Sequence, residues 1–332
     1  MPTLYVTEPG ARLEKEYESL LVTKEDEALL RLPIQNVDAV VLVGPVGATT
    51  QALHALLARQ VPLFLVKYNG ELLGRLTPAQ GYQLSLRQEQ YRRNDDSGFT
   101  LSLARRIVAG KIRNQAVLAK RIARRKKEGG LAALLAQMKD AEAKARTCDS
   151  LETLLGIEGS AARVYFEVLS SAFDPKWKFE KRTRRPPRDP VNALLSLGYT
   201  FLGYAMCAAL EVVGLDPYLG YFHQEAYGRP ALALDLVEEF RAPLVDSLAL
   251  GLLNRRLLRE TDFAPDEAGG IRLSPRGLRV FFREFSDRLE SCVTVRSIGR
   301  PISYRKLMEV QARRLANVLL GKESEYRPFE AR

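Results

Sequence analysis

One change of pattern near Gly81 limits what this chain can fold into more than any other feature of its sequence. Before it, short β-branched or aromatic runs alternate with Gly, Pro and Asn, as in strands joined by turns. After it, apolar residues recur about every 3.6 positions, the period of a helix, almost to the end. The length of 332 residues also exceeds what one hydrophobic core usually supports. The sequence therefore predicts an α+β multidomain protein, with a small β-rich domain over residues 1–85 and a larger all-helical domain over residues 86–332.

Local signals indicate the elements of each domain. Three runs read as strands: Leu4 to Val6, Ala39 to Val43 and Leu63 to Val66. Thr49 and Thr50 stand before QALHALLARQ and predict a helix with a hydroxyl cap between the second and third strands. A connecting helix is expected within residues 81–95. Five later segments have helical length and composition: Leu101 to Lys127, Leu131 to Ala145, Ser160 to Phe173, Pro190 to Val213 and Leu232 to Asn254.

The composition points to a reducing cytoplasm. The three cysteines, Cys148, Cys207 and Cys292, are far apart and form no CxxC pair, so neither a zinc site nor a disulfide framework is expected. The N-terminus lacks a basic start followed by an apolar stretch, and no uninterrupted apolar run reaches about 18 residues. Secretion and membrane spanning are therefore not expected.

The positive charge of the chain is clustered. The formal net charge is +10, and the segment Leu101 to Lys127 holds ten basic residues and no acidic one. A second segment, Lys176 to Pro190, carries seven cations in a Pro-containing stretch typical of an exposed loop, where Trp177 and Phe179 could stack on a splayed base. Either segment alone could be a solvated face. Together they favour nucleic acid, without distinguishing DNA from RNA.

The two histidines differ in their surroundings. His54 lies among helix formers, far in sequence from any carboxylate, and is interpreted as structural. His223 follows a Gly/Pro-rich turn and precedes a helix in which Asp235, Glu238 and Glu239 share one face. One histidine with carboxylates suits Mg²⁺ or Mn²⁺ better than zinc. From spacing alone, a solvated helix face paired with Arg241 is an equally good reading of the three carboxylates.

A further ligand would have to come from elsewhere in the chain, and Glu158 is the candidate. It lies between Gly156 and Gly159, just before a helix rich in small residues, and glycines permit close approach of backbone to a ligand or another helix. A glutamate near a helix N-terminus is also commonly explained by favourable dipole chemistry, so spacing does not identify Glu158 by itself.

Four separated segments resemble one known family. In order, EGSAARVYF, RRPPRDPVNALLSLGYTFL, GLDPYLGYFH and GRPALALDLVEEFR are similar to motifs of the CRISPR-associated Cas-one endonuclease and integrase family. The resemblance covers the helical domain, and the β-rich domain is consistent with it. It implies a role in CRISPR adaptation: a metal-dependent endonuclease and integrase that inserts short DNA fragments (spacers) into a CRISPR array, with a fragment's 3′-hydroxyl attacking a phosphodiester.

The same resemblance implies site residues. It places metal ligands at Glu158, His223 and Glu238, with Mg²⁺ or Mn²⁺ as the cofactor and Asp235 as an auxiliary carboxylate one helical turn earlier. Some members have Asp where this chain has Glu238, so the two carboxylates could exchange importance. Tyr199 and Tyr204 lie near the expected site by sequence and could orient the attacking group or pack in the core.

Partners also follow from the resemblance. It implies a homodimer through the β-rich domain, two such dimers bridged by a Cas-two dimer, and binding of double-stranded DNA fragments and the CRISPR repeat. The expected DNA contacts in the loop and on the long helix are Arg182, Arg184, Arg185, Arg188, Lys120, Arg121 and Arg124. Charge alone supports a second hypothesis equally well, a non-catalytic scaffold for branched DNA in which the carboxylates merely pair with nearby arginines.

Overall fold

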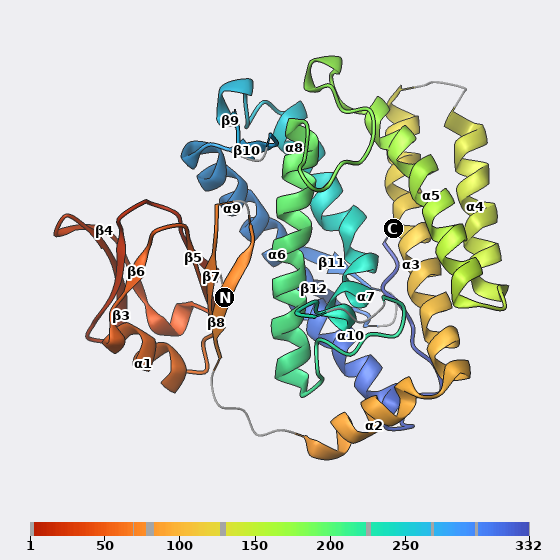
Figure 1. The fold of residues 1–332 in the computed structure, drawn as a ribbon, viewed down its shortest axis with the longest axis horizontal. Coiled ribbons are helices and arrows are strands. Elements are labelled where there is room, and N and C mark those ends of the chain that lie inside the picture. The colour runs from red at the N-terminus through yellow and green to blue at the C-terminus, as the bar shows by residue number, and fades with distance from the viewer. Residues whose placement is uncertain are drawn as a thin grey trace. The chain divides into compact units, whose positions relative to one another are not determined.

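The structure of the protein is a computed structural model that describes residues 3–68, 70–77, 83–126, 131–223, 227–266, 269–295 and 298–331. The chain forms two compact units, residues 1–81 with 258–290 and residues 82–257 with 291–332. The first is rich in strands and the second is mostly helical, as Figure 1 shows, which confirms the predicted fold class. Gly81, where the sequence pattern changes, lies outside the described residues.

The first unit contains two four-stranded sheets. One has the order β1-β5-β7-β8, in which β1 (Thr3–Val6), β5 (Ala39–Val43) and β7 (Leu63–Val66) are parallel and β8 (Leu72–Leu76) is antiparallel. The other has the order β4-β3-β2-β6, formed by β4 (Glu27–Pro33), β3 (Ser19–Lys24), β2 (Arg12–Glu16) and β6 (Gly47–Ala48). The helix α1 (Thr50–Ala58) begins at the predicted cap, where the Thr49 hydroxyl accepts the N–H of Ala52 at 3.2 Å. The three predicted strands are confirmed, and they all lie in the first sheet.

Both sheets and α1 share one hydrophobic core. Val40 and Leu42 of β5, Leu20 of β3 and Leu56 of α1 are all buried in it. The central strand β5 is buried along its whole length, as expected of a parallel strand covered on both faces. The second sheet was not predicted. Four of the five residues of β2 are charged, and the apolar residues of β4 do not alternate with polar ones, so neither segment shows the usual strand pattern.

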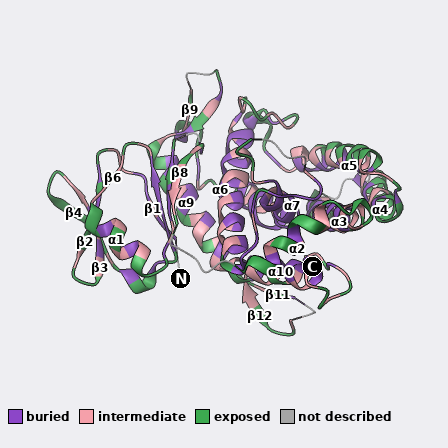
Figure 2. Ribbon diagram, turned by 60° about the horizontal axis from the view of Figure 1, so that its bottom comes forward, coloured by how far each residue is buried: buried purple, intermediate pink, exposed green. Residues whose placement is uncertain are grey.

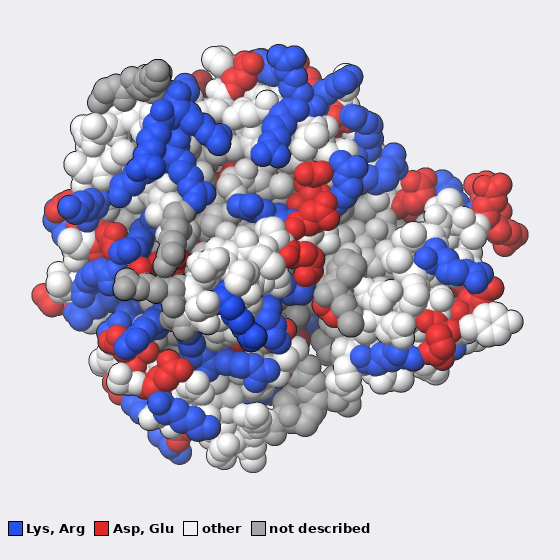
Figure 3. All heavy atoms as spheres, turned by 180° about the vertical axis from the view of Figure 1, so that it is seen from behind, with Lys and Arg blue, Asp and Glu red and all other residues white. Residues whose placement is uncertain are grey.

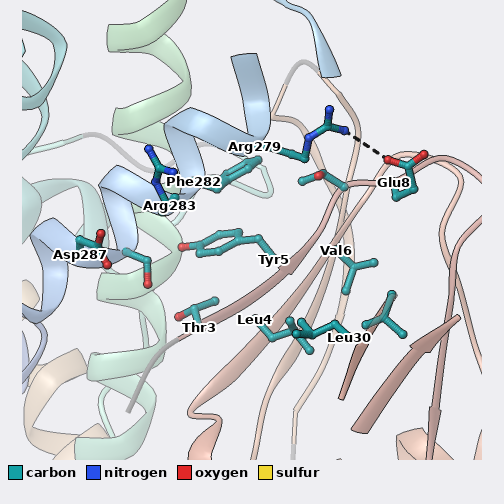
Figure 4. Close-up of a pocket in the computed structure, with 13 residues that line it drawn as sticks. Thr3, Leu4, Tyr5, Val6, Glu8, Leu30, Arg279, Phe282, Arg283 and Asp287 are labelled. Carbon is teal, nitrogen blue, oxygen red and sulfur yellow. Dashed lines mark hydrogen bonds and ion pairs between the residues drawn. The ribbon is translucent and has the colours of Figure 1, made fainter. Parts of the chain in front are cut away.

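Residues 258–290 join this first unit, whereas the sequence pattern placed them in the helical domain. They form η4 (Glu260–Asp262), β9 (Phe263–Pro265), β10 (Ile271–Leu273) and α9 (Pro275–Glu290). Phe282 of α9 stacks on Tyr5 of β1 with ring centroids 4.5 Å apart, and Arg279 pairs with Glu8 at 3.2 Å (Figure 4). These four residues are among those that line a pocket of about 370 Å³ within the unit. Helical periodicity, which continues almost to the end of the chain, carries no information about which core a helix joins.

The second unit is built mainly from helices. They are α2 (Leu84–Asn94), α3 (Ser97–Lys126), α4 (Leu131–Thr147), α5 (Leu151–Ser171), α6 (Pro190–Val213), α7 (Ala231–Phe240), α8 (Ser247–Asn254) and α10 (Tyr304–Leu319), with the 3-10 turn η2 (Pro175–Trp177) and the short strands β11 (Cys292–Thr294) and β12 (Pro301–Ser303). Figure 2 shows that α6 and α7 consist largely of buried residues.

The helix α6 has the bounds predicted from sequence. Asp189 caps it by accepting the N–H of Asn192 at 2.8 Å, Pro190 takes the first helical position, and Gly214 ends it with a left-handed φ of 96°. The helix is long and apolar enough to cross a membrane, with a mean hydropathy of 1.6 over an 18-residue window, yet 67% of that window is buried within the protein. Its burial is that of a core helix.

A π-helical turn interrupts the segment Leu232 to Asn254, which the sequence predicts as one helix. The structure has α7, then η3 (Arg241–Asp246) in π conformation, then α8. Pro243 lies inside η3 and has no N–H to donate to the regular helical ladder, which favours a wider turn. Arg241 and Asp246 are the first and last residues of η3, and both contact residues of the site described below.

The close packing of α6 against η3 gives a testable prediction. A Cβ at Gly198 would come within 2.4 Å of Val245, whereas a Cβ at Gly203 on the same helix would meet nothing within 4 Å. We expect Gly198→Ala to destabilise the protein by about 1–3 kcal/mol, because Val245 has to move. Gly203→Ala should instead be neutral or stabilise by up to about 1 kcal/mol, since alanine is the better helix former. Urea unfolding of both variants checks this, and equal effects would contradict the described packing.

Candidate active site

Three helices of the second unit each direct one charged side chain to the same point. Lys111 on α3 forms an ion pair with Glu158 on α5, and its Nζ lies 2.7 Å from Glu238 Oε2 on α7. His223, from the loop before α7, has Nε2 3.7 Å from Glu238 Oε1. The exposed side-chain fractions are 1% for Glu238, 7% for Lys111, 18% for His223 and 21% for Glu158. The fold thus brings together the three residues nominated as metal ligands, around a lysine; we name these four residues the central cluster.

Asp235 shapes the loop that carries His223. It lies on α7 one turn before Glu238, and its side chain is fully buried. Its Oδ2 accepts the backbone N–H groups of Tyr221 at 2.6 Å and Phe222 at 3.0 Å. Its Oδ1 accepts the backbone N–H of His223 at 2.9 Å and lies 2.7 Å from Nδ1 of the same residue. Both oxygens of Asp235 therefore serve the loop, and the imidazole is held with Nε2 toward Glu238.

Arg241, the first residue of η3, is a second cation beside Glu238. Its Nη1 lies 3.1 Å from Glu238 Oε1, and its guanidinium lies 4.8 Å from the centre of the Tyr199 ring. Burial alone would raise the pKa of Glu238, but Arg241, Lys111 and His223 outweigh it and lower that pKa to about 2. Glu238 is therefore ionised at neutral pH. The pairing with Arg241 considered from the sequence exists, but on a buried face instead of a solvated one.

Asp246, at the other end of η3, holds two tyrosines. Its carboxylate accepts the hydroxyl of Tyr165 at 2.5 Å and that of Tyr199 at 2.6 Å. Burial raises the pKa of Asp246 to about 6, although both hydroxyl donors act in the opposite direction. The hydroxyl of Tyr199 donates to Asp246, and its ring lies near the guanidinium groups of Arg182 and Arg241. Tyr199 therefore helps to hold Arg241 in position beside Glu238. Tyr204 packs edge-on against Phe201 at 5.5 Å.

Glu158 sits differently from its sequence interpretation. The helix α5 starts at Leu151, where the Ser150 hydroxyl caps it by accepting the N–H of Thr153 at 3.1 Å, so Glu158 lies well inside the helix and not at its N-terminus. A Cβ added at Gly156 or Gly159 would meet nothing within 4 Å, so these glycines do not serve close packing in this structure. Helix-dipole stabilisation therefore does not explain Glu158, which instead faces Lys111.

Glu239 does not share the face of Asp235 and Glu238. It is buried on a different side of α7, where its carboxylate accepts hydrogen bonds from Tyr326, from the Phe329 backbone and from Gln311 at 3.0 Å. Burial raises its pKa to about 7 against the effect of these donors. Glu239 therefore fastens the C-terminal segment to the helical core. His54, interpreted as structural, is exposed on α1.

The donor types of the central cluster suit a hard divalent cation. Carboxylate oxygens and one imidazole nitrogen are appropriate ligands for Mg²⁺ or Mn²⁺, and the buried Oε2 of Glu238 accepts no well-directed hydrogen bond. As the side chains stand, however, no group of three His, Cys, Asp or Glu among the described residues is arranged to hold a metal ion. In this arrangement the Lys111 ammonium contacts both Glu158 and Glu238. The residues fit the ion in type, and the lysine lies where their oxygens converge.

The basic residues of α3 divide into two groups. Over residues 106–113, Arg106 pairs with Glu325, Lys111 is buried in the central cluster, and Arg113 pairs with Glu330 at 3.1 Å. The segment has no acid of its own, as the sequence shows, but acids from other elements pair with these three cations. Exposed basic residues occupy its last turns: Lys120, Arg121, Arg124, Arg125 and Lys126. Lys127 lies outside the described residues. Figure 3 shows Lys and Arg side chains gathered over the upper part of one face of the protein.

The loop between α5 and α6 is only partly as predicted. Trp177 and Phe179 are 2% and 7% exposed, so neither ring is presented to a nucleobase. Phe179 packs against Phe173 at 5.5 Å, and these buried rings hold the loop down. Arg182 is also engaged inward, donating to Asn192 Oδ1 at 2.8 Å and to the Ser196 hydroxyl at 2.9 Å. The exposed cations of this loop that remain as candidate DNA contacts are Arg184, Arg185 and Arg188.

Comparisons with known proteins agree with this architecture. A model of the family described as CRISPR associated protein Cas1 matches residues 4–287. The chain is 37% identical to the CRISPR-associated endonuclease Cas1 3 of Thermus thermophilus, over 99% of this chain and 97% of that one. A solved Cas6-RT-Cas1–Cas2 complex contains a chain that matches with a TM-score of 0.83 and 29% identity, over 99% of this chain and 36% of that one.

Some relatives are longer than this chain. It is 38% identical over 99% of its length to a CRISPR-associated exonuclease Cas4/endonuclease Cas1 fusion of Geobacter sulfurreducens, and it spans 60% of that protein. The family model covers most of the chain, and the full-length relative exceeds 30% identity. The chain therefore belongs to the CRISPR-associated Cas1 family, the Cas-one family named above.

Proposed function

We propose that this protein is a divalent-metal-dependent DNA endonuclease and integrase that inserts short DNA fragments into a CRISPR array. The observation that carries the proposal is the buried convergence of Glu158, His223 and Glu238 from three separate segments of a Cas1-family chain. Asp235, a buried carboxylate, holds Nδ1 of His223 and so leaves Nε2 directed toward Glu238. Histidines that bind metal ions are commonly held in this way, whereas a purely structural ion pair has no need of it.

In this proposal Glu158, His223 and Glu238 hold Mg²⁺ or Mn²⁺. Such an ion, when bound, withdraws electron density from a phosphate and stabilises negative charge on the attacking and leaving oxygens. Glu238 contributes an ionised carboxylate, because Arg241 and Lys111 keep its pKa low. Asp235 contributes position and not a ligand atom, because both of its oxygens accept N–H groups of residues 221–223. This arrangement supports Glu238, and not Asp235, as the proposed ligand.

The reaction is a transesterification. The 3′-hydroxyl oxygen of the fragment forms a bond to a phosphorus of the repeat, and the bond from that phosphorus to the 3′-oxygen of the repeat strand breaks. The attacking hydroxyl loses one proton and the departing oxygen gains one, so charge and atoms balance. Water in place of the hydroxyl gives strand cleavage at the same site. The hydroxyl of Tyr199 is held by Asp246, which favours a packing role over contact with the attacking group.

The partners belong to the same proposal. The exposed arginines at 184, 185 and 188 and the exposed cations at the end of α3 would contact the phosphates of double-stranded fragments and of the CRISPR repeat. The similarity to a chain of a Cas6-RT-Cas1–Cas2 complex supports Cas2 as a partner. The proposal adds that a Cas2 dimer bridges two homodimers, each formed through the β-rich unit. We assign the assembly to the prokaryotic cytoplasm.

The salt dependence of DNA binding tests whether the loop between α5 and α6 contacts DNA through Arg184 and Arg185. We expect Arg184→Ala/Arg185→Ala to weaken DNA binding and to reduce the slope of log K against log salt by about 2, one phosphate contact for each arginine. The matched control is Arg12→Ala/Arg31→Ala in the β-rich unit, which removes two exposed arginines as well. Equal slopes for the two double variants, measured by fluorescence anisotropy at several salt concentrations, would remove the loop from the DNA-binding surface.

A non-catalytic scaffold for branched DNA is the second candidate, and one observation favours it. Lys111 and Arg241 already neutralise Glu158 and Glu238, which is the arrangement a purely structural cluster would have. The two functions separate in a cleavage assay on labelled linear and branched duplexes, with Mn²⁺ or with EDTA. The enzyme cleaves only with the ion and loses cleavage on His223→Ala while still binding DNA. A scaffold binds equally well in every case and cleaves in none.

A further inference from the structure

Lys111 is the residue of the central cluster that is neither a proposed metal ligand nor a proposed DNA contact. Lys111 is 7% exposed, and its ammonium is the one cation in the described structure that contacts both Glu158 and Glu238. Arg241, the other cation there, reaches Glu238 alone and is held above the Tyr199 ring. Lys111 therefore joins α3, α5 and α7 at a single point.

We propose that Lys111 is a built-in counter-ion: its ammonium holds Glu158 and Glu238 together when no metal is bound and is displaced by the divalent ion. This proposal rests on the proposed function, because it takes the same three residues as the ligands of that ion.

The charges of Glu158 and Glu238 call for a cation between them. Two carboxylates that converge in a partly buried site repel each other unless a cation lies between them, and the cost grows as water is excluded. Since both acids contact one nitrogen, their nearest oxygens lie within about 6 Å of each other. Arg241 balances one of the two charges, and Lys111 balances the other. Without the lysine, the acids would need a metal ion to remain together.

The ammonium also takes up one oxygen of each acid. It contacts Glu158 Oε1 and Glu238 Oε2, whereas His223 Nε2 lies nearer Glu238 Oε1. An ion that bridges the two oxygens now held by the ammonium would have to take its place between the carboxylates. Lysine is suited to giving way, because its compact ammonium sits on a flexible four-carbon stem, whereas the planar guanidinium of Arg241 is fixed by its stacking.

Lys111 also affects how tightly the site binds the ion. Each binding event has to displace an ammonium, so the affinity for the ion is lower than the ligand set alone would give. Lys111 thus makes the site metal-responsive: the acids stay assembled and correctly placed without metal, and they bind it only above a concentration that the lysine sets.

The test compares Lys111→Met, which keeps the length of the side chain and removes its charge, with Arg113→Met. Arg113 lies on the same helix and pairs with Glu142 and Glu330, outside the cluster. Mn²⁺ binding is measured by calorimetry without DNA, and thermal unfolding is followed in EDTA and in Mn²⁺. We expect Lys111→Met to bind Mn²⁺ about tenfold more tightly or better. It should also unfold at a lower temperature than the native protein in EDTA, with most of that loss restored by Mn²⁺. Arg113→Met should change neither the affinity nor the response to metal.

The outcomes separate this inference from the proposed function. If the native protein binds Mn²⁺ and Lys111→Met binds it no more tightly, the counter-ion role is wrong and the metal site stands. If neither protein binds Mn²⁺, both are wrong. Binding by Lys111→Met alone would support the counter-ion role directly.

A second measurement needs no variant and covers the case in which Lys111→Met does not fold. Crystal structures of the native protein with and without Mn²⁺ should show the Lys111 ammonium in contact with both carboxylates only when the ion is absent. A bound ion with Lys111 still contacting both Glu158 and Glu238 would overturn the proposal.

Discussion

Replacing Glu238 by glutamine is expected to lower metal-dependent strand transfer by at least about 100-fold, because the amide removes the charge that makes this side chain a ligand. Glu238 is 1% exposed and lies within 4 Å of Lys111, His223 and Arg241, so no other carboxylate can take its place without rebuilding the cluster. The measurement is the rate of joining of a labelled duplex at saturating Mn²⁺, with DNA affinity determined in parallel.

The neighbouring residue supplies a matched control. Glu239 is equally buried on the same helix but faces Gln311, Tyr326 and the backbone of Phe329. Glu239→Gln should therefore affect stability and leave the strand-transfer rate within about threefold of the native rate. Equal losses of activity in both variants would show that the effect of Glu238→Gln comes from disturbed folding of α7, and the assignment of Glu238 as a ligand would be lost.

Replacing Asp235 by alanine is the second large effect that we expect. Its carboxylate accepts three backbone N–H groups and faces the Nδ1 atom of His223, so its removal leaves several buried donors without an acceptor. We expect a loss of about 3–5 kcal/mol in the free energy of unfolding, together with loss of strand transfer, because the imidazole is no longer held. Urea unfolding gives the first quantity, and hydrogen exchange of the amides at 221–223 gives its location.

Two results would contradict the role given to Asp235. Unchanged protection of those three amides in Asp235→Ala would mean that the loop is held by something else. A variant that keeps native stability but loses metal binding would show that Asp235 is a ligand after all, which its two occupied oxygens argue against.

Much of the fold follows from the sequence where a local signal decides it. The bounds of α6 are set by Asp189, Pro190 and Gly214, each of which acts within one helical turn, and sequence reasoning places both ends correctly. The strands β5 and β7 are continuous apolar runs and could also be predicted from the sequence. The π turn η3 could not be predicted, because Pro243 indicates a break in a helix but not the wider hydrogen-bond pattern that replaces it.

The ligands of the candidate site could be named from sequence only through family resemblance. Spacing placed Asp235 and Glu238 on one face of a helix, correctly, but it placed Glu239 there as well. Glu158 and Glu238 are brought together through Lys111, a tertiary arrangement that joins positions about 80 residues apart in the chain and that no local pattern encodes.

Lys111 is the residue that sequence reasoning misplaced, although a signal was present. It was counted among the surface cations of a helix that lacks acids, yet it lies three or four positions from Ile107, Val108 and Gln115, all of them buried. A cation on the apolar stripe of an amphipathic helix indicates a buried partner rather than a polyanion. Trp177 was misplaced for the opposite reason: a polar, Pro-rich loop suggested exposure, but the loop folds its aromatic residues into the core.

The central claim is that Glu158, His223 and Glu238 support metal-dependent insertion of DNA. The measurement that tests it most directly is transfer of a labelled short duplex into a supercoiled plasmid that carries a CRISPR repeat, with Cas2 supplied, in Mn²⁺ and in EDTA. The account predicts joined product from the native protein only with Mn²⁺, and none from His223→Ala although its DNA binding persists. Equal background from both proteins, with DNA binding intact, would contradict the account and favour the scaffold.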